Sequence, residues 1–229
     1  RPAVIQINAL PGEVAAALRG REVLDAVSGC KKVVAIWGGH DAEIGRAIGE
    51  LLEKLSEGGA SVHLLIPGEQ GNGRGAEWMG VHPALLPGGR RLAEARDRQA
   101  VEKLWGTELP AEPGLSTREM LTAAAEGRLD VLMLFGANLA QTFPDTALVQ
   151  AALDKAFVVA VDLFLTDTAQ QADVVLPAAS FPARSGTYTT LDGLVQEVDP
   201  AADPEFETWT DGQIINGLAQ ALDIALYES

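Results

Sequence analysis

The sequence is poor in the residues that build metal and redox sites. Its 229 residues include one cysteine, three histidines and 5% aromatic residues. A single cysteine excludes a disulfide within the chain, and an iron-sulfur cluster needs several thiolates. The histidines show no paired helical spacing, so a zinc site built from them has too few ligands. We therefore expect neither a metal site nor a redox centre in this chain.

Basic residues and long apolar runs are also scarce. Lys and Arg number 17 against 32 Asp and Glu, which gives a formal net charge of -15. Such a charge repels phosphate backbones and argues against nucleic acid or an anionic membrane as a partner. No run of about 18 apolar residues occurs, so we expect no direct membrane insertion. The sequence contains neither a G-x-S-x-G motif nor a G-x-x-x-x-G-K-[ST] motif, which excludes two common catalytic loops.

What the chain does contain is a series of short apolar runs separated by helical patterns. Runs of this length bounded by turn residues are typical of parallel strands that are buried on both faces. They predict an α/β fold, a three-layer, doubly wound domain with one mostly parallel sheet. The five expected strands lie at residues 33–37, 62–66, 131–135, 158–161 and 174–176.

Local signals mark where two of the intervening helices begin. Asp41 is a good N-cap, because its carboxylate can accept the free amides of the first turn. Ser116 and Glu119 fit a capping box, and Gly127 suits the left-handed position that ends the same helix.

Length and composition predict one domain over residues 1–229. Residues 1–30 are expected to form a lead-in segment, extended at 4–7 and then helical. Residues 67–91 are expected to form a long glycine-rich loop, and residues 197–229 a C-terminal extension with a helix. The chain starts with neither an initiator Met nor a signal-peptide pattern, so we expect it to be a fragment of a longer polypeptide.

The polar residues that follow the central strands are the first candidates for function. Ligands of open parallel sheets bind at the carboxyl ends of the strands. Gly136 and Asn138 follow the third expected strand, Asp162 follows the fourth and Ser180 follows the fifth. We expect these residues to share one edge of the sheet.

A series of short motifs runs through the same part of the chain in a set order. They are Asn-Gly-Arg-Gly-Ala at 72–76, Phe-Gly-Ala-Asn at 135–138, Phe-Pro-Asp at 143–145, Asp-Leu-Phe-Leu-Thr-Asp-Thr-Ala at 162–169, Ala-Asp-Val-Val-Leu-Pro-Ala-Ala-Ser at 172–180, Gly-Thr-Tyr-Thr at 186–189 and Gly-Leu-Val-Gln at 193–196. This order resembles that of the molybdopterin oxidoreductases, which include formate dehydrogenases and nitrate reductases. The resemblance covers roughly residues 33–196.

The resemblance implies a set of candidate cofactor-binding residues. In molybdenum enzymes of the family, the matching loops help to bind molybdopterin guanine dinucleotide. A carboxylate can accept hydrogen bonds from a guanine, and glycine lets a flat ligand approach the backbone. The alternative is structural: Asp162 and Thr166 cap the following turn, and the glycine-rich loop packs against another part of the parent chain. The candidates are Gln70, Asn72, Gly136, Asn138, Asp162 and Thr166.

Departures from the family pattern favour a scaffold over a cofactor site. The family loop often reads Gly-Glu-Asn-Pro, whereas this chain has Gly136-Ala137-Asn138-Leu139. Gly68 stands where formate dehydrogenases carry an arginine that serves the reaction centre. With these departures, the chain resembles the large peripheral-arm subunit of proton-pumping NADH-quinone oxidoreductase (respiratory complex I). In that subunit the molybdopterin-like region generally serves as scaffold.

That resemblance implies a segment that is not catalytic alone, within an NADH-to-quinone electron-transfer complex. Iron-sulfur clusters are then expected elsewhere in the parent chain, and the partners are its other domains and other subunits of a membrane-associated respiratory complex. The implied location is cytoplasmic, at the inner face of the bacterial membrane. Two alternatives stay open: the molybdopterin guanine dinucleotide-binding portion of a molybdenum oxidoreductase, and an independent small-molecule binding module of doubly wound fold.

Overall fold

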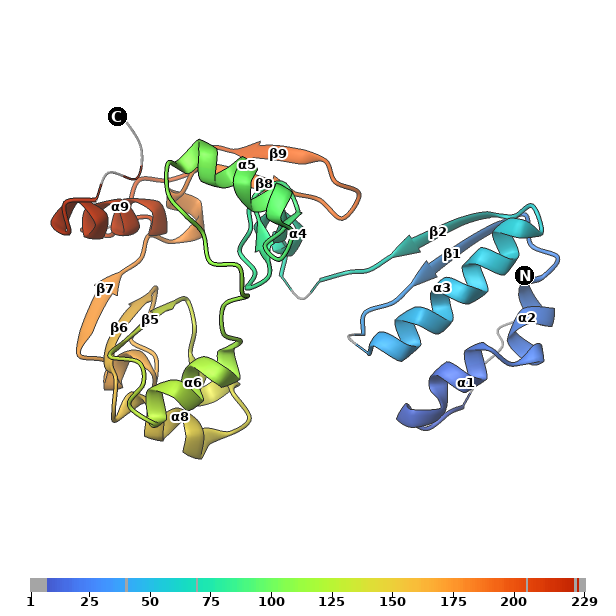
Figure 1. Ribbon diagram of the computed structural model, residues 1–229, viewed down its shortest axis with the longest axis horizontal. Helices are drawn as coiled ribbons and strands as arrows, with labels where there is room; N and C mark the ends of the chain where they lie inside the picture. Colours follow the sequence, from blue (N-terminus) through green and yellow to red (C-terminus); the bar gives the residue numbers. More distant parts are fainter. Residues whose placement is uncertain (1–7, 40, 69, 205, 225, 227–229) are drawn as a thin grey trace. The chain divides into compact units, whose positions relative to one another are not determined.

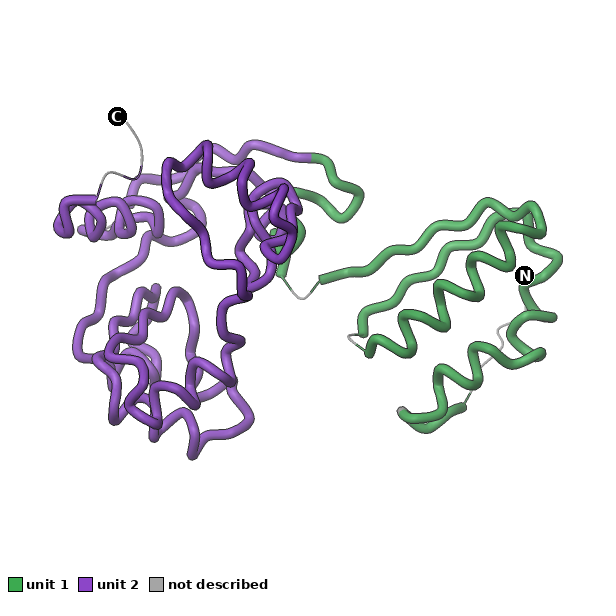
Figure 2. Tube along the Cα trace, viewed as in Figure 1, with its two compact units in different colours: residues 1–74, 189–194 green, residues 75–188, 195–229 purple. Residues whose placement is uncertain are grey.

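The computed structural model describes residues 8–39, 41–68, 70–204, 206–224 and 226, in which helices alternate with strands (Figure 1). The extended piece expected at residues 4–7 lies outside the described residues. The chain divides into two compact units (Figure 2). Unit 1 comprises residues 1–74 and 189–194, and unit 2 comprises residues 75–188 and 195–229.

Unit 1 is built around one strand, helix, strand motif that follows two short helices. The strands are parallel, with Val34 beside His63 in register. The elements are η1 (Pro11–Glu13), α1 (Val14–Leu18), α2 (Arg21–Val27), β1 (Lys32–Ile36), α3 (Ala42–Glu57) and β2 (Ser61–Leu65).

The remaining elements belong wholly or mostly to unit 2. They are α4 (Gly73–Trp78), β3 (Leu85–Leu86), β4 (Arg90–Arg91), α5 (Ala95–Trp105), α6 (Thr117–Ala125), β5 (Val131–Phe135), α7 (Leu139–Thr142), α8 (Thr146–Leu153), β6 (Phe157–Asp162), η2 (Ala169–Gln171), β7 (Val174–Pro177), η3 (Phe181–Ala183), β8 (Gly186–Thr189), β9 (Val195–Val198) and α9 (Asp211–Ala221).

All five expected strands form, and they pair in parallel, so the α/β fold class is confirmed. The prediction that all five strands belong to one sheet is wrong. β1 pairs with β2 in one sheet, and β5, β6 and β7 form another in that order. The apolar pattern of a strand indicates that both its faces prefer burial, but it does not specify which strand lies beside it.

The core of unit 2 lies between the three-stranded sheet and the pair α6 and α8. Leu132, Leu134 and Val158 point from the strands into this core, where they meet Leu121 of α6 and Val149 of α8. Full burial of such a side chain stabilises the fold by about 1.5–3 kcal/mol. On the opposite face of the sheet, α9 packs through Ile214 against Val161 and Ala178. Helix, sheet and helix layers therefore meet at the carboxyl end of β6.

The helix starts follow the sequence signals. The Asp41 carboxylate accepts hydrogen bonds from the amides of Glu43 and Ile44 at 2.8 and 3.0 Å, as an N-cap should. Ser116 and Glu119 form the expected capping box at the start of α6. These expectations are confirmed because they depend only on residues within one helical turn.

The segment at residues 67–91 is more ordered than the expected loop. It contains α4, which is followed by Gly80 at a φ of +81°, and the antiparallel pair β3 and β4. Gly88 and Gly89 connect β3 to β4 with φ values of +83° and +67°. Glycine adopts these left-handed conformations without a steric penalty, so the glycines serve tight turns as well as loop backbone.

Within the described ranges, no helix is both long enough and apolar enough to cross a membrane.

Candidate functional site

A backbone hydrogen bond links the carboxyl ends of β5 and β6. Gly136 follows β5 with a φ of +59°, and its amide donates a hydrogen bond to the carbonyl of Val161 at 2.8 Å. The left-handed conformation favours glycine at this position. The loops after the two strands therefore start side by side, as expected from the sequence.

Asn138 is held by a threonine from the second loop. Its Oδ1 accepts hydrogen bonds from the backbone amide of Thr168 at 3.2 Å and from the Thr168 hydroxyl at 2.9 Å. The same hydroxyl accepts a hydrogen bond from the Ala140 amide at 2.9 Å. Thr168 is 1% exposed, so this polar link is buried. The side chain of Asn138 thus connects the loop after β5 to the loop after β6.

Asp162 and Thr166 make hydrogen bonds within their own loop. One carboxylate oxygen of Asp162 accepts from the Leu163 amide at 2.7 Å, and the other lies 3.5 Å from the Thr166 hydroxyl. The Thr166 hydroxyl also accepts a hydrogen bond from the Ala169 amide at 3.3 Å. These are the contacts of residues that shape a turn.

Gln70 and Asn72 belong to unit 1, whereas the other four candidates belong to unit 2. Asn72 Oδ1 accepts a hydrogen bond from the Thr189 amide at 2.9 Å. Two residues on, Arg74 donates to the Leu191 carbonyl at 2.8 Å. Gln70 is exposed, and its carbonyl accepts a bond from the Gly73 amide. This end of the glycine-rich segment therefore fixes the turn at residues 189–194.

The Phe-Pro-Asp motif at residues 143–145 has a structural role. Asp145 accepts a hydrogen bond from the Leu148 amide at the start of α8 and pairs with Arg118 at 3.2 Å. The hydrogen bond from the Leu148 amide, and to a smaller extent that from Arg118, holds the pKa of Asp145 below its usual value. The Arg118 guanidinium also lies 5.3 Å from the centroid of the Phe143 ring. The motif thus links α8 to α6.

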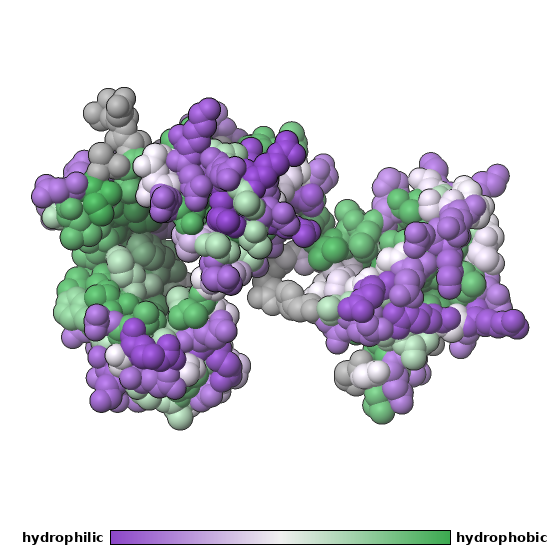
Figure 3. All heavy atoms as spheres, in the orientation of Figure 1, coloured by the Kyte–Doolittle hydropathy of each residue, from purple (hydrophilic) through white to green (hydrophobic). Residues whose placement is uncertain are grey.

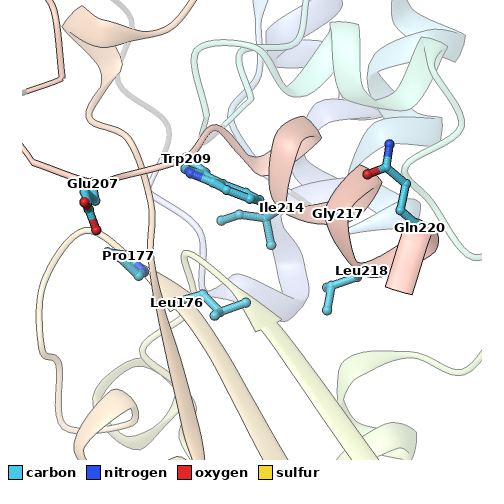
Figure 4. Close-up of a pocket in the computed structure, with 8 residues that line it drawn as sticks. All are labelled: Leu176, Pro177, Glu207, Trp209, Ile214, Gly217, Leu218 and Gln220. Atoms are coloured by element: carbon cyan, nitrogen blue, oxygen red, sulfur yellow. The ribbon is translucent and has the colours of Figure 1, made fainter. Parts of the chain in front are cut away.

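Two features that sequence reasoning missed complete the picture. One is Thr168, which lies within the motif at 162–169. Nothing in the sequence indicates that its hydroxyl contacts Asn138. The other is a groove of about 440 Å³ between β7 and α9 (Figure 4). Trp209 and Ile214 line one side of the groove, and Leu176 lines the sheet side. The sequence predicts a helix in the C-terminal extension, but not that a hollow lies beneath it.

No cluster of three or more His, Cys, Asp or Glu suited to a metal ion occurs among the residues that the structure describes. Cys30 is exposed, just beyond the end of α2.

The comparisons with known proteins show which family the chain belongs to. The family model for molybdopterin oxidoreductase matches residues 21–221. The chain belongs to the molybdopterin oxidoreductase family. This match covers most of the chain, including every strand of both parallel sheets.

Curated relatives in this family have different functions. The chain is 38% identical over 161 residues to a G-type subunit of the NADH-quinone oxidoreductase of Rhizobium meliloti, covering 70% of this chain and 19% of the relative. It is 39% identical over 159 residues to the G-type subunit of the same enzyme of Streptomyces coelicolor, covering 67% and 19%. It is 38% identical over 164 residues to the assimilatory nitrate reductase catalytic subunit of Bacillus subtilis, covering 70% and 23%. The chain thus matches about a fifth of the length of these relatives.

The family implies a molybdopterin cofactor, which places demands on the side chains at the edge. Hydrogen-bonding groups for a guanine or pterin should face outward and lack internal partners. Asn138 Oδ1 instead receives two hydrogen bonds from Thr168, and Asn72 Oδ1 receives one from Thr189. No buried side-chain nitrogen or oxygen in the described residues lacks a partner. The side-chain oxygens of Asn138 and Asn72 are thus engaged within the protein.

Proposed function

We propose that this chain is a scaffold segment of the large peripheral subunit of an NADH-quinone oxidoreductase and carries no redox centre of its own. The internal use of the polar groups at the carboxyl edge carries the proposal, above all the buried link between Asn138 and Thr168. A residue that joins two loops in this way keeps the fold together without a ligand. Two relatives named as subunits of this enzyme, at 38% and 39% identity, support the same assignment.

On this proposal, residues 1–229 act as one molybdopterin-oxidoreductase-like domain of a longer subunit. Electron transfer from NADH to quinone takes place through iron-sulfur clusters held elsewhere in that subunit, since this chain has one cysteine. Its partners are the other domains of the subunit and other subunits of a respiratory complex. The complex places the segment on the cytoplasmic side of the bacterial membrane, without insertion of this segment.

A thermal-shift experiment tests the scaffold role. If Asp162 serves only its turn, Asp162→Ala costs on the order of 1 kcal/mol, the value of a lost hydrogen bond. The melting temperature of neither protein then changes with added GDP. Asp167→Ala is the matched control, because Asp167 is an exposed carboxylate of the same loop.

The second candidate function is a guanine dinucleotide site of a molybdenum oxidoreductase. Gly136 favours it, because beyond its own chain neighbours no atom lies within 4 Å of the position that a Cβ would occupy there, which leaves room beside the backbone. The match to a nitrate reductase supports the same function. A ligand at 100 times its Kd stabilises the folded state by about 2.7 kcal/mol. A melting temperature that rises with GDP, but not in Asp162→Ala, would therefore replace the scaffold proposal with this one.

A further inference from the structure

The three-stranded sheet of unit 2 is apolar on both faces, but its two faces are covered to different extents. Leu132, Leu134 and Val158 point into the core beneath α6 and α8. On the opposite face, α9 packs on the last row of side chains, at Val161 and Leu176. Two further rows of this face lie outside that cluster. These rows are Val131 and Phe157, and then Met133, Val159 and Val174.

The uncovered rows expose large side chains. Val131, Met133 and Phe157 are 52%, 41% and 49% exposed. The groove between β7 and α9 continues this surface at the carboxyl end, where Trp209 is 54% exposed. Figure 3 shows hydrophobic residues gathered around the hollow below α9. Contiguous apolar surface of this kind marks an interaction site.

We propose that this sheet face and groove bind an amphipathic helix from another part of the same polypeptide. Parallel strands that are apolar on both faces are typical of sheets covered on both sides. A strand rises about 3.3 Å per residue, so the two bare rows lie about 6.6 Å apart along the strands, within the 10–12 Å diameter of a helix. One helix beside α9 covers the bare rows.

The charge of the groove indicates the polarity of that helix. Glu207 is the one charged residue among those that line the groove, and Figure 4 shows its side chain beside Pro177 at one end of it. The whole chain carries a formal net charge of -15. The helix therefore presents an apolar stripe to the sheet and a basic residue to Glu207.

The source of the helix follows from the lengths of the relatives. The matched stretch is 19% of each of the two NADH-quinone oxidoreductase relatives, so about four fifths of those polypeptides lie outside it. The inference thus rests on the proposed function in one respect, that this chain works within a longer polypeptide. The nucleotide experiment tests the scaffold role separately, because it does not depend on what covers the sheet.

Oxidative footprinting of the methionines tests the inference without a substitution. Short hydroxyl-radical pulses are applied to the 229-residue chain and to the longer polypeptide purified without other subunits, and each methionine is read by mass spectrometry. Met133 should be oxidised at least about tenfold more slowly in the longer polypeptide, because the bound helix excludes solvent from it. Met120 is the internal reference, because it is 37% exposed but lies on α6.

Glu207→Lys adds the charge test. In the longer polypeptide it should raise the oxidation of Met133 at least about threefold, because the basic residue is then repelled. Glu197→Lys makes the same charge change on exposed β9 and should leave the rate unchanged.

Other outcomes would overturn the inference. Equal oxidation of Met133 in the two proteins would mean that nothing covers the face. Protection that appears only when other subunits are added would assign it to a partner subunit. Slow oxidation in the 229-residue chain that becomes fast on dilution would assign it to a second copy, and slow oxidation at every dilution would show that the face is already covered.

Discussion

The two parallel sheets of this chain have the same local pattern and different burial. Both consist of apolar strands connected by a helix, and both pair in parallel register. In unit 2, Leu134 and Val158 are 8% and 0% exposed beneath two helices. In unit 1, no residue of β1 or β2 is buried, and Ile36 is 71% exposed.

The difference shows that burial depends on the elements that pack on a strand. Two helices cover one face of β5 and β6, whereas α3 buries its own apolar residues, such as Ala47 and Leu55, without burying the strands beside it. The strands of unit 1 are as apolar as those of a covered sheet, but none of their residues is buried. Because they bury little apolar surface, we expect them to contribute little to the free energy of unfolding.

Matched leucine truncations in the two sheets should give the largest contrast. Leu134→Ala in β5 removes a core side chain and should lower the free energy of unfolding by about 2–5 kcal/mol. Leu64→Ala in β2 removes a side chain that is 39% exposed and should cost less than about 1 kcal/mol. Urea denaturation followed by circular dichroism measures both. Equal costs would show that β2 is buried in solution.

Threonine substitutions at the carboxyl edge test whether a buried polar link matters as much as the apolar core. Thr168→Val preserves the shape of the side chain but leaves Asn138 Oδ1 and the Ala140 amide without the hydroxyl. The expected cost is about 1–3 kcal/mol, the penalty of unsatisfied buried groups. Thr142→Val, at a threonine whose hydroxyl bond is exposed, should stay within about 0.5 kcal/mol. A neutral Thr168→Val would remove the main support for the scaffold proposal.

Features encoded over a few residues could be predicted from the sequence. Strand positions follow from apolar runs, and the caps at Asp41 and Ser116 follow from side chains that reach amides one turn away. The division into two sheets could not be predicted, because strand pairing depends on contacts between distant segments. The many glycines at residues 67–91 predicted a loop. Glycines are equally compatible with the tight turns that follow α4 and connect β3 to β4, so the sequence did not distinguish the two structures.

The candidate site was predictable in position but not in connectivity. Gly136 and Asp162 follow neighbouring strands, so their place at one edge comes from the general rule for parallel sheets. The bond between Asn138 and Thr168 spans 30 residues, and no spacing rule pairs them. Asn72 was predicted to bind a ligand. Its side-chain Oδ1 instead accepts a hydrogen bond from the amide of Thr189, which is 117 residues away in the sequence.

The smallest effect concerns the surface charges that join α1 to α3 in unit 1, where core packing is thin. Arg19 Nε contacts Glu50 Oε2 at 2.7 Å, and Arg19 Nη1 contacts Glu43 Oε1 at 2.6 Å. The hydrogen bond from Arg19 holds the pKa of Glu50 below its usual value. A carboxylate whose pKa is depressed by folding stabilises the fold above its unfolded pKa, and this contribution is lost as the pH falls through the folded pKa.

Amide exchange in α1, corrected for intrinsic rates, should therefore rise modestly when the pH falls below the usual range of glutamate. High salt should have a similar effect at neutral pH, because exposed ion pairs are screened. Arg19→Gln should raise exchange at neutral pH and remove both dependences, whereas Arg96→Gln, on α5 in unit 2, should change neither. If α1 exchanges at the same rate in Arg19→Gln as in the unchanged chain, then apolar contacts such as that of Ala15 hold α1 in place, and the two units differ less than their burial suggests.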